Sequence, residues 1–226
     1  MPHLLDNIIW NSLAGSQAQF SSGTDAGRRY ARGYSPIIGF PDPHRPDFAA
    51  ITPFCAHDEH FYCDIWSGPA PSGWQIEKEA TMVKMIWDAP MPEEDLAPDA
   101  IALGPEHAQG AFELAQLTNP GPFGPRTPEL GEYFGFFEGD TLIAMAGERM
   151  QAESLREISG VCTRPGFTGR GLAGLLTLKI VRRQMERGQT PFLHVMTANT
   201  GARRLYEKLG FRVYLETVVR VVSRRN

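Results

Sequence analysis

The sequence contains no apolar run that approaches the roughly 20 residues of a membrane-spanning helix. Its first residues, MPHLLDNIIWNSLAGSQ, have neither the basic start nor the long apolar stretch of a secretory signal. Cysteine is scarce, and Cys55, Cys63 and Cys162 cannot all form pairs, so disulfides are not expected to stabilise the fold. We therefore predict a cytoplasmic protein without a membrane partner.

Basic and aromatic residues are not interleaved as they are on nucleic-acid-binding surfaces, and the net charge is −4, so no nucleic-acid partner is expected. The charges are unevenly divided: residues 155–226 hold 14 Lys/Arg and 4 Asp/Glu, whereas residues 1–154 hold 8 and 22. This asymmetry favours a small polyanionic ligand in the C-terminal half and a cationic substrate such as an amine near the acidic half. The alternative is that uneven charge only keeps the two halves soluble.

Two phosphate-binding motifs are incomplete in this chain. The spacing from Gly166 to Gly171 fits a P-loop, but the lysine and hydroxyl residue that should follow are missing. GRGLAG (169–174) matches the dinucleotide fingerprint G-x-G-x-x-G, yet no acidic residue ends the next predicted strand, roughly 20 residues on. What remains is a glycine-rich loop before a helix, whose amides can hold a pyrophosphate.

Turn and periodicity signals divide the chain near the acidic, proline-rich segment 88–100, which is typical of a linker. We predict an N-terminal domain over residues 1–98, of α/β type and unassigned role, and a second domain over residues 99–226. The second domain is predicted to contain strands at 100–103, 132–150 (two around the turn Glu138–Asp140), 155–163, 191–199 and from 211 as a strand or hairpin, with helices at 104–118, 169–188 and 200–210. The order predicts an α/β (α+β) fold with a mixed central sheet flanked by helices, in which 191–199 is a central parallel strand.

The stretches VCTRPGFTGRGLAGLL and PFLHVMTANTGARRLYEKLGF resemble the Gcn5-related N-acetyltransferase (GNAT) superfamily, nearest to its FR47-like and glycine N-acyltransferase-like C-terminal domains. The resemblance covers about residues 100–223 and implies the GNAT fold. It also implies acetyl-CoA as co-substrate, no metal, and direct acetyl transfer to a primary amine of a small molecule or amino acid in a ternary complex. Homodimer formation is left open. The N-terminal part could wall the acceptor cleft, replace a second subunit, or be a degenerate copy of the same fold.

The resemblance also implies which residues contact coenzyme A. Backbone amides from Gly169 to Ala173 would hold the pyrophosphate, and the backbone of Val161 and Thr163 would pair with the pantetheine arm. The family usually has Arg or Gln where this chain has Thr168. The full set of implied positions is Val161, Cys162, Thr163, Thr168, Gly169, Arg170, Gly171, Leu172, Ala173, Asn199, Arg203 and Tyr206.

Two residues are predicted to be catalytic. Glu157 is the candidate base, and its apolar neighbours are expected to raise its pKa by desolvation; the alternatives are a structural carboxylate paired with Arg156 or Arg164, and proton removal through water. Tyr206 is the candidate acid for the departing thiolate, or else a helix aromatic whose hydroxyl finds a backbone partner. His194 is interpreted as a core histidine and held in reserve as a catalytic one, because its strand is apolar on both sides.

Three weaker interpretations remain. The loop GPFGPRT (121–127) is expected to lie over the acceptor site in this superfamily, where Phe123 or Arg126 would contact substrate, or else to be a rigid connector. The cluster CAHDEHFYC (55–63) crowds four potential ligands into nine residues, which disfavours zinc. Two other functions stay open: a non-catalytic acyl-CoA-binding module and a dinucleotide oxidoreductase.

Overall fold

The computed structural model describes residues 3–225, and its centre is an eight-stranded sheet. The strand order is β4-β11-β5-β10-β9-β8-β7-β6, and every neighbouring pair is antiparallel except β9 and β10. The strands are β4 (His60–Asp64), β5 (Trp74–Trp87), β6 (Ile101–Ala102), β7 (Tyr133–Glu138), β8 (Thr141–Ala152), β9 (Leu155–Thr163), β10 (Thr190–Met196) and β11 (Phe211–Arg224). The sheet is mixed, as the sequence predicts.

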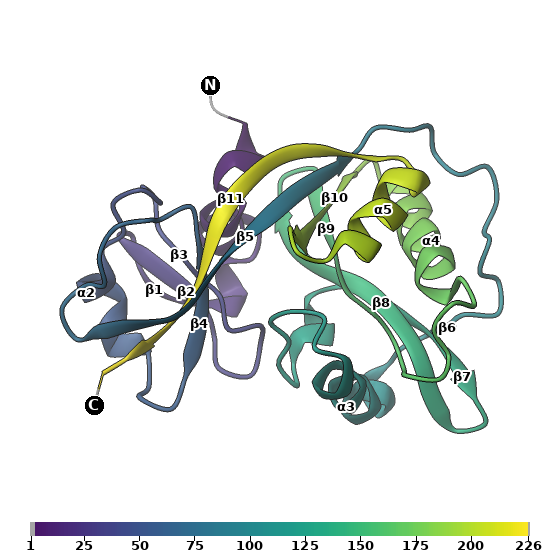
Figure 1. The fold of residues 1–226 in the computed structure, drawn as a ribbon, viewed down its shortest axis with the longest axis horizontal. Helices are drawn as coiled ribbons and strands as arrows, with labels where there is room; N and C mark the ends of the chain where they lie inside the picture. Colours follow the sequence, from purple (N-terminus) through teal and green to yellow (C-terminus); the bar gives the residue numbers. More distant parts are fainter. Residues whose placement is uncertain (1–2, 226) are drawn as a thin grey trace.

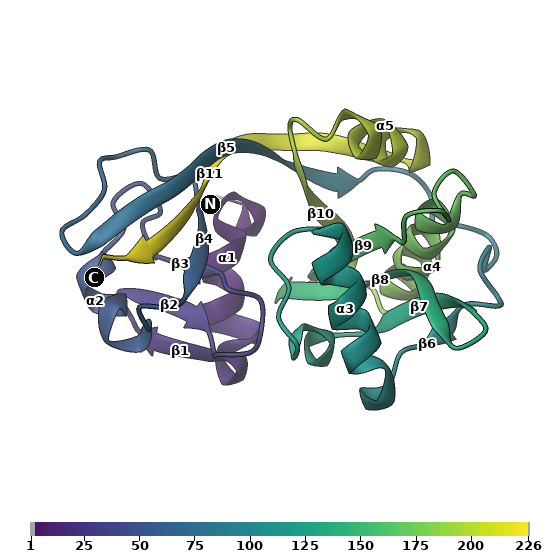
Figure 2. The ribbon, with the colours of Figure 1, turned by 60° about the horizontal axis from the view of Figure 1, so that its bottom comes forward.

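Helices cover both faces of the C-terminal part of this sheet (Figures 1 and 2). α3 (Ala108–Thr118) packs on one face, where its alanines and leucine meet side chains of β8 and β9. α4 (Leu172–Glu186) packs on the other face over β8, β9 and β10, and α5 (Thr200–Leu209) lies beside it. Alternate residues of the strands therefore enter separate apolar cores, as the period-2 geometry of a strand requires.

The N-terminal residues form a smaller lobe, which we define as residues 3–73. It contains the antiparallel sheet β1 (Ser21–Thr24), β2 (Gly27–Tyr30) and β3 (Ile38–Gly39), with the helices α1 (Ile8–Asn11) and α2 (Phe48–Ile51). Short 3₁₀ segments lie at Leu4–Asn7, Ala18–Phe20, Thr52–Phe54, Pro105–His107 and Thr127–Leu130, and a π segment at Ser12–Ser16. The core of the N-terminal lobe is filled by an aromatic cluster of Phe40, Phe48, Phe61 and Trp66, together with Trp74 of β5.

Two long strands join this lobe to the C-terminal lobe, defined as residues 101–210. β5 and β11 pair from Trp74↔Arg224 to Trp87↔Phe211 and arch across the molecule (Figure 1). The segment 88–100, where the sequence predicts a domain boundary, therefore connects β5 and β6 of one sheet. Its prolines indicate an irregular connection, and such a connection can join two strands of a single sheet as well as two domains.

A shared apolar core fixes the two lobes against each other. Leu5, Ile8 and Leu13 of the N-terminal lobe are fully buried, and they cluster with Phe192 of β10 and Leu155 of β9. Each fully buried aliphatic side chain contributes about 1.5–3 kcal/mol of transfer free energy. The lobes are consequently held by packed side chains as well as by the continuous strands.

The predicted elements of residues 99–226 are present, with one difference in detail, and the structure decides one alternative that the sequence left open. β10 is central but is parallel only to β9, because its other neighbour is the antiparallel β5. The final segment is the single strand β11, since it has β4 and β5 as partners and no hairpin turn is needed. Among residues 3–225, no helix is both long and apolar enough to cross a membrane.

Candidate active site

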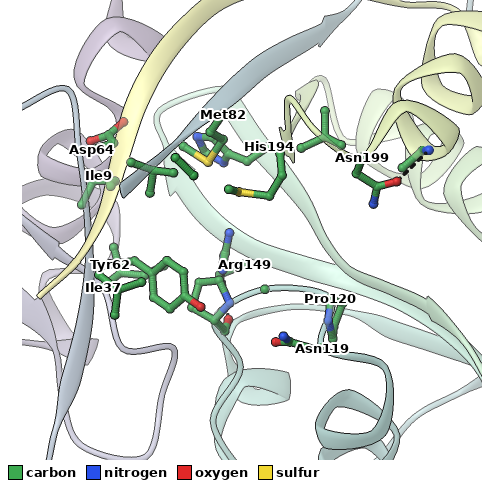
Figure 3. Close-up of a pocket in the computed structure, with 18 of the residues that line it drawn as sticks. Ile9, Ile37, Tyr62, Asp64, Met82, Asn119, Pro120, Arg149, His194 and Asn199 are labelled. Carbon is green, nitrogen blue, oxygen red and sulfur yellow. Dashed lines mark hydrogen bonds between the residues drawn. The ribbon is translucent and has the colours of Figure 1, made fainter. Parts of the chain in front are cut away.

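A pocket of about 260 Å³ lies where the two lobes meet under the arch of β5 and β11 (Figure 3). Residues from both lobes and from both arch strands line it, so it exists only in the assembled molecule. They are Ile9, Ile37, Tyr62, Cys63 and Asp64 of the N-terminal lobe, Lys78, Ala80 and Met82 of β5, Asn119–Pro122, Arg149, Met150, Val161, His194–Met196, Asn199, Ala202 and Tyr206 of the C-terminal lobe, and Val219 and Val221 of β11.

One side of the pocket is formed by the separation of the two parallel strands. The pairing of β9 with β10 ends at Ile158↔Leu193, although the strands continue to Thr163 and Met196. A register shift in the β8–β9 ladder and a positive φ of 64° at Gly160 mark a bulge at the same point. Backbone groups near Val161 thus lose their partner on β10, which leaves an edge that an extended ligand can pair with.

The glycine-rich loop ends directly at the N-terminus of α4. Gly166, Gly169 and Gly171 adopt positive φ values of 89°, 79° and 77°, conformations that favour glycine. A Cβ at any of these positions would meet no atom within 4 Å, so the loop faces open space. Gly171 is the N-cap of α4 and its side-chain-free backbone leaves the first amides of a 15-residue helix accessible to an anion. Gly174, the third fingerprint glycine, instead lies inside the helix, where a Cβ would contact Leu205 at 3.5 Å.

The residues with implied coenzyme contacts fall into two groups. Val161, Asn199 and Tyr206 line the pocket. The others lie outside it, at the end of β9, in the glycine-rich loop, at the start of α4 and on α5: Cys162, Thr163, Thr168, Gly169, Arg170, Gly171, Leu172, Ala173 and Arg203. The two groups follow a line from the loop to the pocket along the gap between β9 and β10, the course that an elongated coenzyme would need.

Three of these residues have further structural constraints. The side chain of Asn199 accepts a hydrogen bond from the Ala202 amide at 3.1 Å, so it also caps α5. Cys162 is buried in the apolar cluster against α3, and burial raises the pKa of its thiol to about 11. Arg203 has a buried Nε without a hydrogen-bond partner in the described part of the chain.

Tyr206 lies at the pocket wall with only 7% of its surface exposed. Its ring packs edge-on against Phe211 at a centroid distance of 6.0 Å. Burial, with a smaller effect from Cys162, raises the pKa of the phenol to about 12. The hydroxyl therefore stays protonated at neutral pH and is available as a donor.

Glu157 is in a different electrostatic state from the one the sequence predicts. Its side chain is fully buried and accepts two hydrogen bonds from Arg149, at 2.8 Å from Nε and 2.6 Å from Nη2, and one from the Met150 amide at 3.1 Å. Although burial alone favours the neutral acid, the Arg149 guanidinium holds the pKa of Glu157 well below its usual range. The predicted rise in pKa is wrong, and neither Arg156 nor Arg164 is the partner.

His194 completes this buried group and faces the pocket. Its Nδ1 lies 2.7 Å from Oε1 of Glu157, and its side chain is only 6% exposed. The other ring nitrogen, Nε2, is buried and has no hydrogen-bond partner among residues 3–225. The interpretation of His194 as a core residue misses this position at a cavity wall.

The loop after α3 reaches the pocket through residues other than the predicted ones. Asn119 to Pro122 line it, whereas Phe123 packs edge-on against Tyr133 at 5.9 Å. Arg126 lies over the ring of Tyr34 at 4.4 Å and pairs with Glu129 at 2.7 Å, on the surface between the lobes. The structure therefore does not bring Phe123 or Arg126 to the pocket, because the loop turns away after Pro122.

Sequence reasoning missed the contribution of the N-terminal lobe to this site. Tyr62 and Asp64 of β4 line the pocket, and Asp64 forms a buried ion pair with Lys84 of β5 at 3.0 Å. Lys84 also donates to the backbone carbonyls of Leu5 and Asp6, at 3.2 and 3.1 Å. A lysine in the apolar run ATMVKMIW was the available signal, because a buried lysine needs a charged partner.

The cysteine-histidine cluster of residues 55–63 does not converge on one point. Cys55 and Cys63 are buried thiols whose pKa values burial raises, that of Cys55 to about 11. His60 pairs with Glu77 at 2.7 Å instead. Within residues 3–225, no three His, Cys, Asp or Glu side chains are grouped as metal ligands.

Comparisons with known proteins agree with this architecture. The model of the family described as FR47-like protein matches residues 133–221. The chain is similar to a GNAT-family protein from Novosphingobium aromaticivorans DSM 12444, with 32% identity over 100% of both chains and a TM-score of 0.91. A GCN5-related N-acetyltransferase from Kribbella flavida shares the fold at 19% identity, with a TM-score of 0.59 over 96% of both chains. A GCN5-related N-acetyltransferase-like protein from Streptococcus suis 89/1591 does so at 14% identity, with a TM-score of 0.63 over 96% of this chain and 92% of its own. No curated protein matches the chain.

Proposed function

The chain belongs to the GNAT family of N-acetyltransferases, and from that premise we propose that it transfers acetyl from acetyl-CoA to a primary amine of a small molecule. The acceptor nitrogen attacks the thioester directly while both substrates are bound. The observation that carries this proposal is the pocket between the lobes, which contacts the gap between β9 and β10 on one side and the N-terminal lobe on the other. Such a pocket can hold a donor and an acceptor together.

The donor half of the proposal depends on the glycine-rich loop and the strand gap. The open amides at Gly171 and the N-terminus of α4 suit a pyrophosphate, and the free edge near Val161 suits the amide groups of pantetheine. Bound along this course, acetyl-CoA supplies an activated acetyl group at the pocket. The departure at Thr168 removes one potential side-chain contact and leaves these backbone contacts intact.

The acceptor half depends on the wall formed by the N-terminal lobe and the arch. Most of this wall is apolar, with Ile9, Ile37, Met82 and Val219 lining the cavity, and Met150 of the C-terminal lobe also lines it. An amine carried on an apolar body fits such a lining, and the flexible methionines can adapt to its shape.

One charged group of the pocket has no compensating partner. Asp64 pairs with Lys84, and Arg149 and His194 pair with Glu157, whereas Lys78 has no ion pair within the described residues 3–225. Lys78 is therefore the candidate to bind the carboxylate of an amino-acid acceptor, in place of Arg126.

Tyr206 is proposed to protonate the departing thiolate, since it lines the pocket and its raised pKa keeps it protonated. A covalent acetyl-cysteine route is not part of the proposal. Cys162 packs towards α3 with a raised pKa, and a thiol that stays protonated is a poor nucleophile.

The test has two arms. In the first, acetyl-CoA, longer acyl-CoAs and NADH are compared by thermal denaturation, and we expect stabilisation by the acyl-CoAs alone. In the second, acetyl-CoA is incubated with a panel of apolar amines and amino acids, and release of the free thiol is followed. Stabilisation by acetyl-CoA without thiol release from any acceptor would indicate a binding module, and stabilisation by NADH alone would indicate an oxidoreductase.

A further inference from the structure

We propose that His194 is the general base of the transfer and that Glu157 and Arg149 are its positioning residues. The inference rests on the proposed acetyl transfer and assigns the base within it. It replaces Glu157 as the group that receives the acceptor's proton.

The hydrogen bond to Glu157 fixes the proton on one ring nitrogen. A carboxylate only accepts hydrogen bonds, so the contact of 2.7 Å between Nδ1 and Oε1 requires that Nδ1 carries the hydrogen in the neutral ring. The lone pair is then on Nε2, which is buried without a partner in the described part of the chain. His194 itself lines the pocket (Figure 3), so its imidazole ring lies next to an acceptor that binds there.

Glu157 is poorly placed to take the proton itself. Both of its oxygens already accept hydrogen bonds, from Arg149, the Met150 amide and His194, and it is fully buried behind them. It also does not line the pocket. Its negative charge instead stabilises the imidazolium that forms when His194 is protonated, and Arg149 holds it in orientation through two hydrogen bonds.

The charges around His194 are balanced in pairs. Glu157 of β9 is neutralised by Arg149 of β8. Lys84 of β5 is the cross-strand neighbour of His194, and its ammonium is engaged by Asp64 of β4 at 3.0 Å. Protonation of His194 leaves both of these ion pairs intact and adds a charged contact to Glu157, so His194 can take up a proton within this group.

The proton balance of the reaction is complete with these groups. Nε2 of His194 takes one proton from the acceptor ammonium, and the neutral nitrogen then forms the bond to the thioester carbon. When the carbon–sulfur bond breaks, Tyr206 donates its proton to the sulfur and is restored by the second proton leaving the nitrogen. His194 finally releases its proton to solvent, so one ammonium and one thioester yield an amide, a thiol and a proton.

The experiment compares His194→Asn with the matched variant His60→Asn. The amide of asparagine can keep the hydrogen bond to Glu157 but has no basic nitrogen at the Nε2 position. His60 also contacts a glutamate at 2.7 Å, yet it lies outside the pocket. We expect His194→Asn to lower kcat by about 100-fold with little change in KM for acetyl-CoA, and His60→Asn to leave both unchanged.

A pH series separates a catalytic from a structural role. Wild-type kcat should depend on pH through a group that must be deprotonated to act as the base, and this dependence should be absent in His194→Asn. Equal kcat and the same pH profile in wild type and His194→Asn would overturn the base while leaving acetyl transfer intact. Wild-type protein that binds acetyl-CoA but acetylates no amine would overturn the transfer and the base together.

Discussion

Two glutamates on neighbouring strands of the sheet are both buried against arginines, and only one of them is hydrogen-bonded to a histidine that lines the pocket. Glu148 of β8 is 2% exposed and pairs with Arg156 at 3.0 Å and with Arg187, while Gln184 donates to it at 3.1 Å. Glu157 of β9 is paired as tightly, but its last partner is His194, which lines the pocket and whose Nε2 has no hydrogen-bond partner in the described part of the chain.

The comparison teaches that a buried, arginine-paired carboxylate does not by itself mark a reactive site. The difference lies in the third partner: the other groups around Glu148 only donate hydrogen bonds to it, whereas Glu157 contacts an imidazole, whose second nitrogen is an acceptor when the ring is neutral. Glu148 connects β8 to the end of α4, and Glu157 connects β8 to His194 at the pocket wall.

The largest expected effect is the loss of stability when Glu148, the glutamate without a partner at the pocket, is removed. Glu148→Ala leaves Arg156 buried without its carboxylate, so we expect the free energy of unfolding to fall by about 3–5 kcal/mol. Denaturant unfolding of this variant and of the exposed control Glu153→Ala provides the measurement. A loss below about 1 kcal/mol, which is the range of a surface pair, would contradict the structural role.

The next effect is on turnover. Glu157→Gln presents an amide donor to His194, which favours the opposite tautomer and removes the lone pair from Nε2, so kcat should fall by about 100-fold. KM for acetyl-CoA should change little, because Glu157 does not contact the coenzyme course. The role of Glu157 in positioning would be refuted by a Glu157→Gln enzyme that stays folded and keeps wild-type kcat.

The free energy of unfolding should depend on pH in a way that reports whether Glu157 is ionised in the folded protein. The folded-state pKa of Glu157 lies below its ordinary value of 4.5, so its contribution is present above pH 4.5 and is lost as the pH falls below it. Glu132, whose pKa Arg183 and Arg187 lower to about 2, behaves in the same way. The free energy of unfolding should fall on acidification, by up to about 1.4 kcal/mol per pH unit for buried Glu157. The slope should be shallower in Glu157→Gln than in wild type, and an unchanged slope would show that Glu157 is not held ionised.

The smallest effect concerns the acceptor. Lys78→Gln removes the one uncompensated charge of the pocket, so KM for amino-acid acceptors should rise by about fivefold, which corresponds to about 1 kcal/mol for a partly solvated ion pair. KM for simple amines should not change. Arg45→Gln, on an exposed loop outside the pocket, serves as the control; a similar rise for both classes of acceptor would exclude recognition of a carboxylate by Lys78.

The sequence predicted the C-terminal lobe well because its signals are local. Strand alternation, the glycines before α4 and Asn199 before α5 each depend on residues close in the chain. The place of β5 between β10 and β11 was not predictable in this way, because both of its neighbours lie more than a hundred residues later.

The charge state of Glu157 depends on which residues lie opposite it in the sheet, and the composition of its own strand does not show this. Apolar neighbours of Glu157 suggested a raised pKa, but Arg149 lies eight residues earlier on the paired strand and reverses the direction. The β8–β9 ladder contains two register shifts, so no simple counting across the hairpin would have aligned these two side chains. The same register sets His194 beside Glu157, which a strand pattern cannot reveal.

The position of β5 in the sheet also determines the order in which the molecule can assemble on the ribosome. β5 is synthesised early, yet its first hydrogen-bonded neighbour, β10, emerges only after residue 190, and β11 follows last. Contacts such as Arg220 to Glu79, 141 residues apart, close the sheet at the end. Until then the apolar stretch Val83–Trp87 has no partner strand, so the nascent chain passes through a slow, aggregation-exposed stage before its pocket exists.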